Sequence, residues 1–181
     1  MSQSESRDRR RRTREEPEFD ERVISIDRTA KVLKGGRTFR FRVVVVVGDN
    51  HGRVGAAVGK ANEVPEAIRK GLERAKRSMV QVPIIDDTIP HQVNTKYSAV
   101  RIMLHPARPG TGVIAGRGAR AVLEAAGVRN ILTKVHGSNN VLNVTMGTFD
   151  AVKQLKDPRD EARRRGKDVE QVMPVRSRSD G

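Results

Sequence analysis

Alternating hydrophobic and polar positions predict an antiparallel sheet near the start of the chain. Residues 23–33 carry Val and Ile in an extended pattern, and the Gly-Gly pair within 34–37 predicts a tight turn because glycine readily adopts positive φ. Residues 39–43 then alternate Phe or Val with Arg, which is typical of a half-buried strand. The valine run 43–47 predicts that this strand continues with both faces covered.

A third strand and a helix complete the first unit. Turn residues at 48–52 predict a hairpin, after which residues 53–60 return as a strand. Asn62 is the predicted N-cap of a helix with Pro65 in its first turn, where the missing N–H costs little. Apolar residues recur at helical spacing up to Met79, with a basic face opposite. The order β-β-β-α predicts one amphipathic helix packed on one sheet.

A second unit follows a stretch bounded by prolines. The expected domains cover 19–82 and 92–156, with a linker over 83–91 between them. Strands are predicted over 89–93, 99–105 and 128–135, and helices over 117–126, closed by Gly127, and up to Leu155, capped from Ser138, Asn139 or Asn140. The order β-β-α-β-α predicts an α+β sandwich, so the fold class is α+β with two small domains.

The two ends of the chain lack hydrophobic periodicity. Residues 1–18 hold six Arg and five acidic residues, which predicts a disordered N-terminal segment. Residues 157–181 are charged and aperiodic, and we expect a charged tail with room for a short helical piece.

The charge of the chain points to a polyanionic partner. The formal net charge is +14, and residues 22–77 alone hold fourteen basic and five acidic side chains. Nucleic acid and an anionic membrane surface both fit such a surface. No apolar run approaches the roughly 20 residues that cross a bilayer, and no secretory signal is present, so a soluble cytoplasmic protein is expected.

The scarcity of aromatic residues favours one mode of nucleic-acid binding. Aromatics make up 3% of the chain, too few for base-stacking platforms once the cores are filled. Arg and Lys without aromatics suit recognition of duplex shape and phosphate. The candidate contacts in the first unit are Arg28, Lys31, Lys34, Arg37, Arg40, Arg42, Arg53, Lys60, Arg69, Lys70, Arg74 and Arg77. For each one alone, a solvated surface charge remains the alternative.

Nothing in the sequence supports catalysis, a cofactor or a metal site. There is no Cys, the four His lack metal-binding spacing, and Asp86 and Asp87 are neighbours that point apart on an extended chain. Gly116, Gly118 and Ala121 match G-x-G-x-x-A, but the acid that a dinucleotide site needs about 20 residues later is missing. Glycines beside Arg117 and Arg120 at a helix start could instead approach an RNA backbone, or serve only packing and solubility.

Four segments carry a resemblance to a known family. They read KGGRTFRFRVVVVVGDNHGRVGAAVGK (34–60), NEVPEAIRKGLERAKRSMV (62–80), PARPGTGVIAGRGARAVLEAAG (106–127) and VRNILTKVHGSNNVLNV (128–144). In this order they resemble the bacterial-type family of small-subunit ribosomal protein S5, over roughly residues 19–156. The resemblance implies a first domain related to the double-stranded-RNA-binding fold without its first helix. It also implies a second domain with a left-handed βαβ crossover, against the usual hand.

The resemblance also implies partners and sites. Family members bind small-subunit (16S-type) ribosomal RNA, contact proteins S4 and S8, and lie near the channel where messenger RNA enters. They support translational accuracy, the positioning of head and body, and subunit assembly. The loop from Arg28 through Lys31 to Gly35 and Gly36 would lie beside the head–body hinge of the RNA. The region of Gly110, Gly112 and Arg120 would face S4 and affect fidelity, with Arg117 adding a charge where many members have Gly.

Two alternatives remain open on the sequence. One is a free-standing double-stranded-RNA-binding protein that acts off the ribosome. The other is an enzyme that uses the loop from Gly110 to Gly118 for a phosphorylated substrate, although no candidate general base lies near it.

Overall fold

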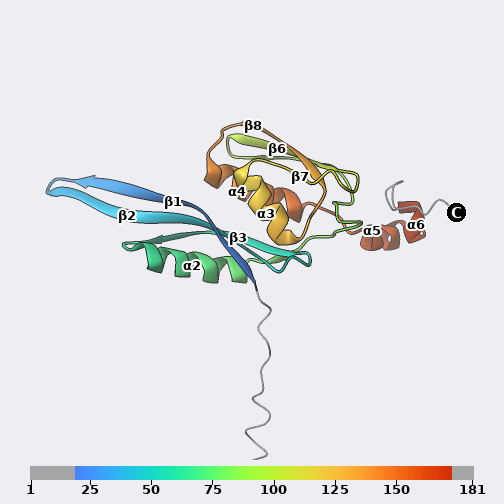
Figure 1. Cartoon of the computed structure of the whole chain (residues 1–181), viewed down its shortest axis with the longest axis horizontal. Helices are drawn as coiled ribbons and strands as arrows, with labels where there is room; N and C mark the ends of the chain where they lie inside the picture. Colours follow the sequence, from blue (N-terminus) through green and yellow to red (C-terminus); the bar gives the residue numbers. More distant parts are fainter. Residues whose placement is uncertain (1–18, 173–181) are drawn as a thin grey trace, which may run out of the picture.

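Two four-stranded sheets and their helices build the chain, in a computed structural model that describes residues 19–172 (Figure 1). The predicted disordered segment, 1–18, lies outside the described residues, as does the end of the predicted tail. Within the described part, no helix combines the length and the apolar character needed to cross a membrane.

The first sheet has the order β1-β2-β3-β4, and all its neighbours are antiparallel. Its strands are β1 (Asp20–Leu33), β2 (Gly36–Gly48), β3 (Arg53–Ala61) and the two-residue β4 (Val80–Gln81). Helix α2 (Val64–Arg77) covers one face of β2 and β3. The predicted β-β-β-α order is confirmed, and β4 is an addition that the sequence did not indicate.

The second sheet has the order β5-β6-β8-β7. Its strands are β5 (Val93–Tyr97), β6 (Val100–Pro106), β7 (Val113–Ile114) and β8 (Ile131–Gly137). Helix α3 (Arg117–Ala126) connects the parallel strands β7 and β8, and α4 (Val141–Lys153) follows. Helices α5 (Pro158–Arg165) and α6 (Val169–Val172) lie within the stretch predicted as a charged tail.

Three boundary predictions were wrong. The N-cap of α2 is Glu63 rather than Asn62, because β3 continues to Ala61 and the first helical hydrogen bond runs from the Ala67 N–H to the Glu63 carbonyl. The strand predicted over 89–93 is β5 and begins only at Val93, since Ile89 is buried in a loop. The strand predicted over 128–135 begins at Ile131, because the preceding N–H groups donate to the end of α3 and to the Asp87 carbonyl.

The valine run in β2 is buried on both faces, as predicted. Val43, Val45 and Val47 pack with α2, whereas Val44 and Val46 join a larger core that includes α3 and α4. Val82, the last residue of the predicted first domain, and Ile89, within the predicted linker, are fully buried in that same core. The two sheets therefore share one hydrophobic core, and α3 lies between them (Figure 1).

Backbone hydrogen bonds fix this contact between the units. The N–H groups of Asn50 and Gly52, in the β2–β3 turn, donate to the carbonyls of Ala125 and Ala126 at 3.1 and 2.8 Å. Gly48 makes the approach possible, since a Cβ added there would lie 1.9 Å from the Ala125 carbonyl oxygen. The turn of the first sheet thus satisfies carbonyls at the C-terminal end of α3, which its own helix leaves unpaired.

Candidate nucleic-acid interface

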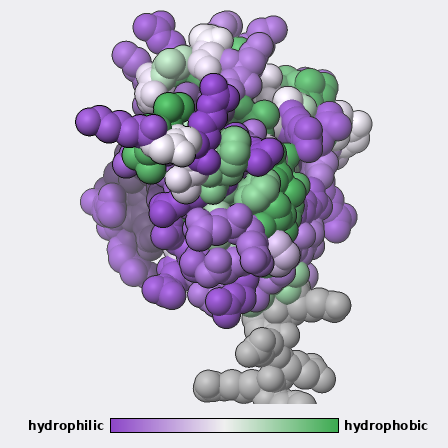
Figure 2. Space-filling model, turned by 90° about the vertical axis from the view of Figure 1, so that its left-hand side faces the viewer, coloured by the Kyte–Doolittle hydropathy of each residue, from purple (hydrophilic) through white to green (hydrophobic). Residues whose placement is uncertain are grey.

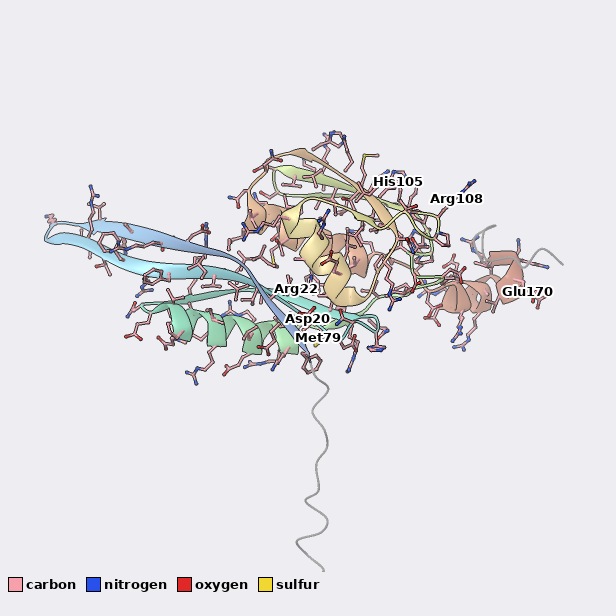
Figure 3. All side chains as sticks on the ribbon, viewed as in Figure 1. Asp20, Arg22, Met79, His105, Arg108 and Glu170 are labelled. Carbon is pink, nitrogen blue, oxygen red and sulfur yellow. The ribbon has the colours of Figure 1, made fainter. Side chains whose placement is uncertain are left out.

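A two-stranded arm extends from the first sheet beyond the rest of the molecule (Figure 1). Strand β3 pairs with β2 only from Phe41 to Gly48, so residues 29–40 pair only with one another; together with Arg28, which pairs with Phe41, they are here called the hairpin arm (28–40). All thirteen residues of the hairpin arm are exposed. Five of them are basic and none is acidic. The side chains project from both sides of the ribbon (Figure 3).

The strand register gives the hairpin arm two different faces, because residues directly opposite in an antiparallel pair share a face. One face carries the pairs Thr29–Arg40 and Lys31–Thr38 and is polar. The other carries the pairs Arg28–Phe41, Ala30–Phe39 and Val32–Arg37, and continues the α2 side of the sheet. We call them the polar face and the aromatic face.

A basic groove lies beside α2, where the edge of β3 is not paired with a strand. It is lined by Arg42, Val58, Lys60, Lys70, Glu73, Arg74, Arg77 and Leu142. Arg74 Nη1 donates to the Val58 carbonyl at 2.8 Å, so an arginine satisfies one carbonyl of the strand edge. Seen from the end where the hairpin arm projects, most of the surface is hydrophilic (Figure 2). The groove and the hairpin arm are the two places where the structure gathers the predicted RNA contacts.

The cations of the groove and the hairpin arm fall into two groups: those that form an ion pair within the described chain and those that do not. Arg42 pairs with Asp27 at 3.0 Å and Lys70 pairs with Glu66 at 2.7 Å. Hydrogen bonding to Lys70 lowers the pKa of the Glu66 carboxyl. By contrast, the arm residues Lys31, Lys34, Arg37 and Arg40 form no ion pair with any described residue. Their charges remain available for an external anion.

Two predicted contacts lie apart from the others. Arg53 stands at the β2–β3 turn, at the opposite end of the sheet from the tip of the hairpin arm, and its Nε lies 2.7 Å from Asp49. Arg69 is on the exposed side of α2 and does not line the groove. The structure therefore does not bring Arg53 together with the arm, which makes this residue a suitable control for charge removal.

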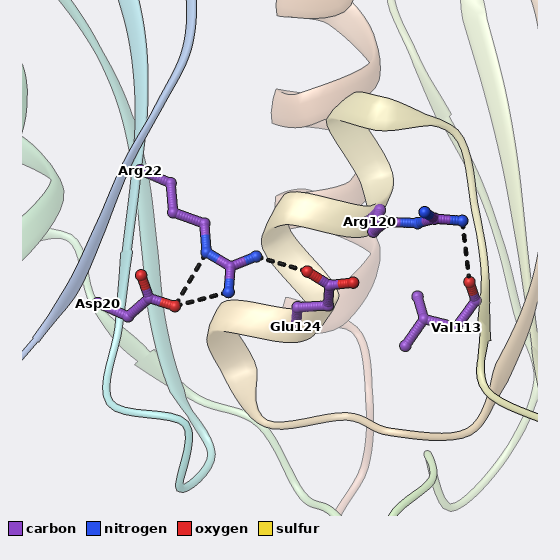
Figure 4. Close-up of polar contacts among 5 residues, drawn as sticks. All are labelled: Asp20, Arg22, Val113, Arg120 and Glu124. Carbon is purple, nitrogen blue, oxygen red and sulfur yellow. Dashed lines mark hydrogen bonds and ion pairs between the residues drawn. The ribbon is translucent and has the colours of Figure 1, made fainter. Parts of the chain in front are cut away.

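The loop before α3 places the predicted protein-interface residues on the surface. Gly110 and Gly112 have φ of +86° and +76°, and an added Cβ would meet nothing within 4 Å at either position. The Arg120 guanidinium donates to the Val113 carbonyl at 3.3 Å (Figure 4). Arg117 and Arg120 line a shallow cavity together with Arg22 and Glu124. These two glycines are thus needed for backbone conformation and not for close packing.

An ion cluster beside this cavity connects the two units. Arg22 of β1 donates to Asp20 and to Glu124 of α3, at 2.9 and 2.6 Å (Figure 4). Hydrogen bonding to Asp20 raises the pKa of Arg22; burial opposes this rise, and the hydrogen bond to Glu124 adds to it. The arginine is therefore held charged between two carboxylates, one from each unit.

Sequence reasoning missed an exposed aromatic residue. Phe39 was expected in a half-buried strand, but 41% of its surface is exposed. The Arg28 guanidinium lies over its ring, 3.7 Å from the centroid. The sequence feature that could have revealed this exposure is the length of the strands, since β2 carries the alternating pattern several residues past the end of β3.

Comparisons with known proteins agree along nearly the whole described chain. The profile of "Ribosomal protein S5, N-terminal domain" matches residues 19–83, and that of "Ribosomal protein S5, C-terminal domain" matches residues 95–165. The small ribosomal subunit protein uS5 of Chloroflexus aurantiacus is 53% identical over 161 residues, covering 89% of this chain and 90% of that protein. Its counterpart in Thermotoga maritima is 53% identical over 156 residues, with 86% and 88% covered. That of Syntrophobacter fumaroxidans is 52% identical over 152 residues, with 84% and 92% covered.

Proposed function

Because the chain belongs to the ribosomal protein S5 family, we propose that its hairpin arm and basic groove bind small-subunit ribosomal RNA, mainly through phosphate. As a family member the chain is a structural constituent of the small ribosomal subunit and not an enzyme. The observation that carries the proposal is an exposed arm with five cations and no acidic residue. A surface of this kind attracts a polyanion and releases its counterions on binding.

The groove supports the same proposal from a second direction. Lys60 and Arg77 line it without forming an ion pair among the described residues, whereas Arg42 pairs with Asp27 and Arg74 donates to the Val58 carbonyl. Cations on both walls of a groove focus the electrostatic field within it, which favours a polyanion such as a phosphate backbone. We therefore assign Lys60, Lys70, Arg74 and Arg77 to the same interface as the arm.

We further propose contacts between the second unit and neighbouring ribosomal proteins. We assign the region of Gly110, Gly112, Arg117 and Arg120 to a contact with protein S4, and a further surface of the second unit to protein S8. Through these contacts the chain would help to fix the head relative to the body, support accuracy, and line the channel where messenger RNA enters. The exposed loop and the exposed Arg117 and Arg120 at the start of α3 support a protein contact at this position.

Salt dependence tests the RNA contact. The combined change of Arg37→Gln and Arg40→Gln removes two arm charges that no internal carboxylate needs. We expect weaker binding to small-subunit ribosomal RNA, and a log–log salt slope smaller by about 0.7–0.9 for each phosphate interaction removed. Filter binding of the purified chain at several salt concentrations measures both quantities.

The matched control is Arg53→Gln, which removes a charge at a paired position away from the arm. Its salt slope should equal that of the unchanged chain. If the arm variant and the control gave the same slope, the arm would not be the interface. Polysome profiling addresses the free-standing alternative, which requires the chain to sediment only at the top of the gradient.

A further inference from the structure

Phe39 is the one aromatic side chain that the fold leaves exposed. The chain has five aromatics, all within the described residues, and the other four are buried or half-buried. Phe19 and Phe41 pack against the α2 side of the sheet, and Phe149 lies in the shared core. Phe39 therefore contributes little to either core, although an exposed ring is a cost to solubility and a hazard for aggregation.

The Phe39 ring lies against a second planar group, the guanidinium of Arg28. The Arg28 guanidinium carbon lies 3.7 Å from the ring centroid, which is van der Waals contact between two flat groups. Arg28 is itself exposed and forms no ion pair with any described residue. Opposite Phe39 stands Ala30, whose small side chain leaves space beside the ring. The aromatic face of the arm thus presents a flat guanidinium on a flat ring, held by two paired strands.

Charge and shape together select the partner. Arginine planes and aromatic rings are the two protein surfaces on which unstacked RNA bases stack. Arg37 is on the same face and Lys34 is in the adjacent turn, so phosphates on either side of such a base would meet cations. An apolar protein surface fits poorly here, because the charges of Arg28, Arg37 and Lys34 would be desolvated along with the ring.

We infer that Arg28 and Phe39 form a stacking platform for one unpaired nucleobase of ribosomal RNA. The inference rests on the proposed RNA-binding function and deepens it: the polar face of the arm contacts phosphates, whereas the aromatic face reads a base that has left its helix. It also changes the binding mode expected from composition. A low aromatic content does not exclude stacking when the fold holds one ring outside the core.

A tryptophan substitution of Phe39 tests the platform directly. The chain contains no Trp, so Phe39→Trp introduces a single indole fluorophore at the proposed site. We expect its emission to be quenched when full-length protein is saturated with small-subunit ribosomal RNA of the same organism, since stacking on a base quenches indole. Thr38→Trp is the matched control, because position 38 lies on the polar face of the same strand. Its emission should change much less.

Affinity separates stacking from charge. Phe39→Leu keeps an apolar side chain and removes the ring, so binding should weaken by about 5- to 150-fold, the equivalent of 1–3 kcal/mol per stacked base, with no change in salt slope. Arg40→Gln should lower the slope instead. Arg28→Lys keeps the charge but loses the plane, and should weaken binding without changing the slope.

The possible outcomes distinguish a failure of the stacking platform from a failure of the proposed RNA-binding function. If the unchanged chain failed to bind the RNA, the proposed function would fail first. If it bound, but the indole emission of the Phe39→Trp variant stayed constant at saturation and Phe39→Leu bound normally, the platform would be refuted while RNA binding stood. Quenching of that indole only after other subunit proteins are added would assign the ring to a protein contact and likewise refute the platform.

Discussion

At the residue scale, Asp49 organises the β2–β3 turn that joins the two units. Its carboxylate accepts from the backbone N–H groups of His51 and Arg53, both at 2.9 Å, and from Arg53 Nε at 2.7 Å. Only 9% of the Asp49 side chain is exposed. Burial favours the neutral acid, but the hydrogen bonds from Arg53 and His51 outweigh it and lower the pKa of Asp49 below its ordinary 3.8.

Replacing Asp49→Asn should therefore destabilise the protein in a pH-dependent way. A carboxyl whose pKa is lower in the folded state stabilises the fold above its unfolded pKa, near 3.8. That stabilisation is lost as pH falls through the lower, folded pKa. We expect the variant to lose about 1 kcal/mol at pH 7 and little in strong acid. Urea unfolding at several pH values measures the difference. A difference that stayed constant down to about pH 2 would contradict the assignment.

Phe39 and Asn62 show what a sequence can and cannot predict for single residues. Alternation correctly placed Phe39 on a strand, but exposure depends on where the neighbouring strand ends, and that is a tertiary fact. Asn62 has the right side chain for a cap, yet β3 extends to Ala61 and moves the helix start by one residue. Asn140 was predicted as a possible cap and does accept from the Leu142 N–H, because no strand competes for that position.

At the element scale, the packing of α2 on β3 depends on glycine. A Cβ added at Gly59 would lie 1.9 Å from the Ala67 carbonyl oxygen, and one at Gly55 would lie 2.2 Å from that of Ala75. Both obstacles are helix backbone, which cannot rotate away as a side chain could. The helix thus lies closer to the strand than any side chain on these two residues would permit.

Gly59→Ala should separate α2 from the sheet. Overpacking of this kind costs about 1–3 kcal/mol, and a rigid backbone obstacle favours the upper end of that range. Gly35→Ala is the control, since an added Cβ there meets nothing within 4 Å and the backbone is not in the left-handed region. Thermal unfolding followed by circular dichroism compares the two variants. Equal midpoints would show that the helix can move away at little cost.

The predictability of whole elements followed their length. The long strands β2 and β3 and the helices α2, α3 and α4 were predicted because each repeats its pattern over several residues. The two-residue strands β4 and β7 were missed, since two residues carry no period. Residues 89–93 have strand-like composition, but the chain there supplies buried side chains from a loop, and composition alone does not separate these cases.

At the scale of the whole molecule, the two units bury residues in one shared core. Val44, Val46 and Val54 of the first sheet are fully buried among residues of α3 and α4. Without the second unit, that face of the sheet would meet water. The alternating pattern of a strand does not report this partner, because a valine buried by its own helix and one buried by a distant helix look the same in sequence.

We therefore expect the full chain to unfold in a single transition and a fragment of residues 1–90 to fold poorly. The fragment keeps α2 but loses the cover of Val44 and Val46, and it should bind a hydrophobic dye and lack a cooperative thermal transition. Differential scanning calorimetry of both proteins measures this. A fragment with its own sharp transition would show that the first sheet is independent after all.

The placement of α3 between the sheets also affects how the protein is made. During synthesis the valine-rich strands leave the ribosome long before the helices that cover one of their faces, since α3 begins only at Arg117. Until then the nascent chain exposes one apolar face of the sheet, although α2 can already cover the other face and the cationic hairpin arm can already form. The nascent chain is thus most prone to aggregation, and to non-specific binding of RNA, in the interval before its second half emerges.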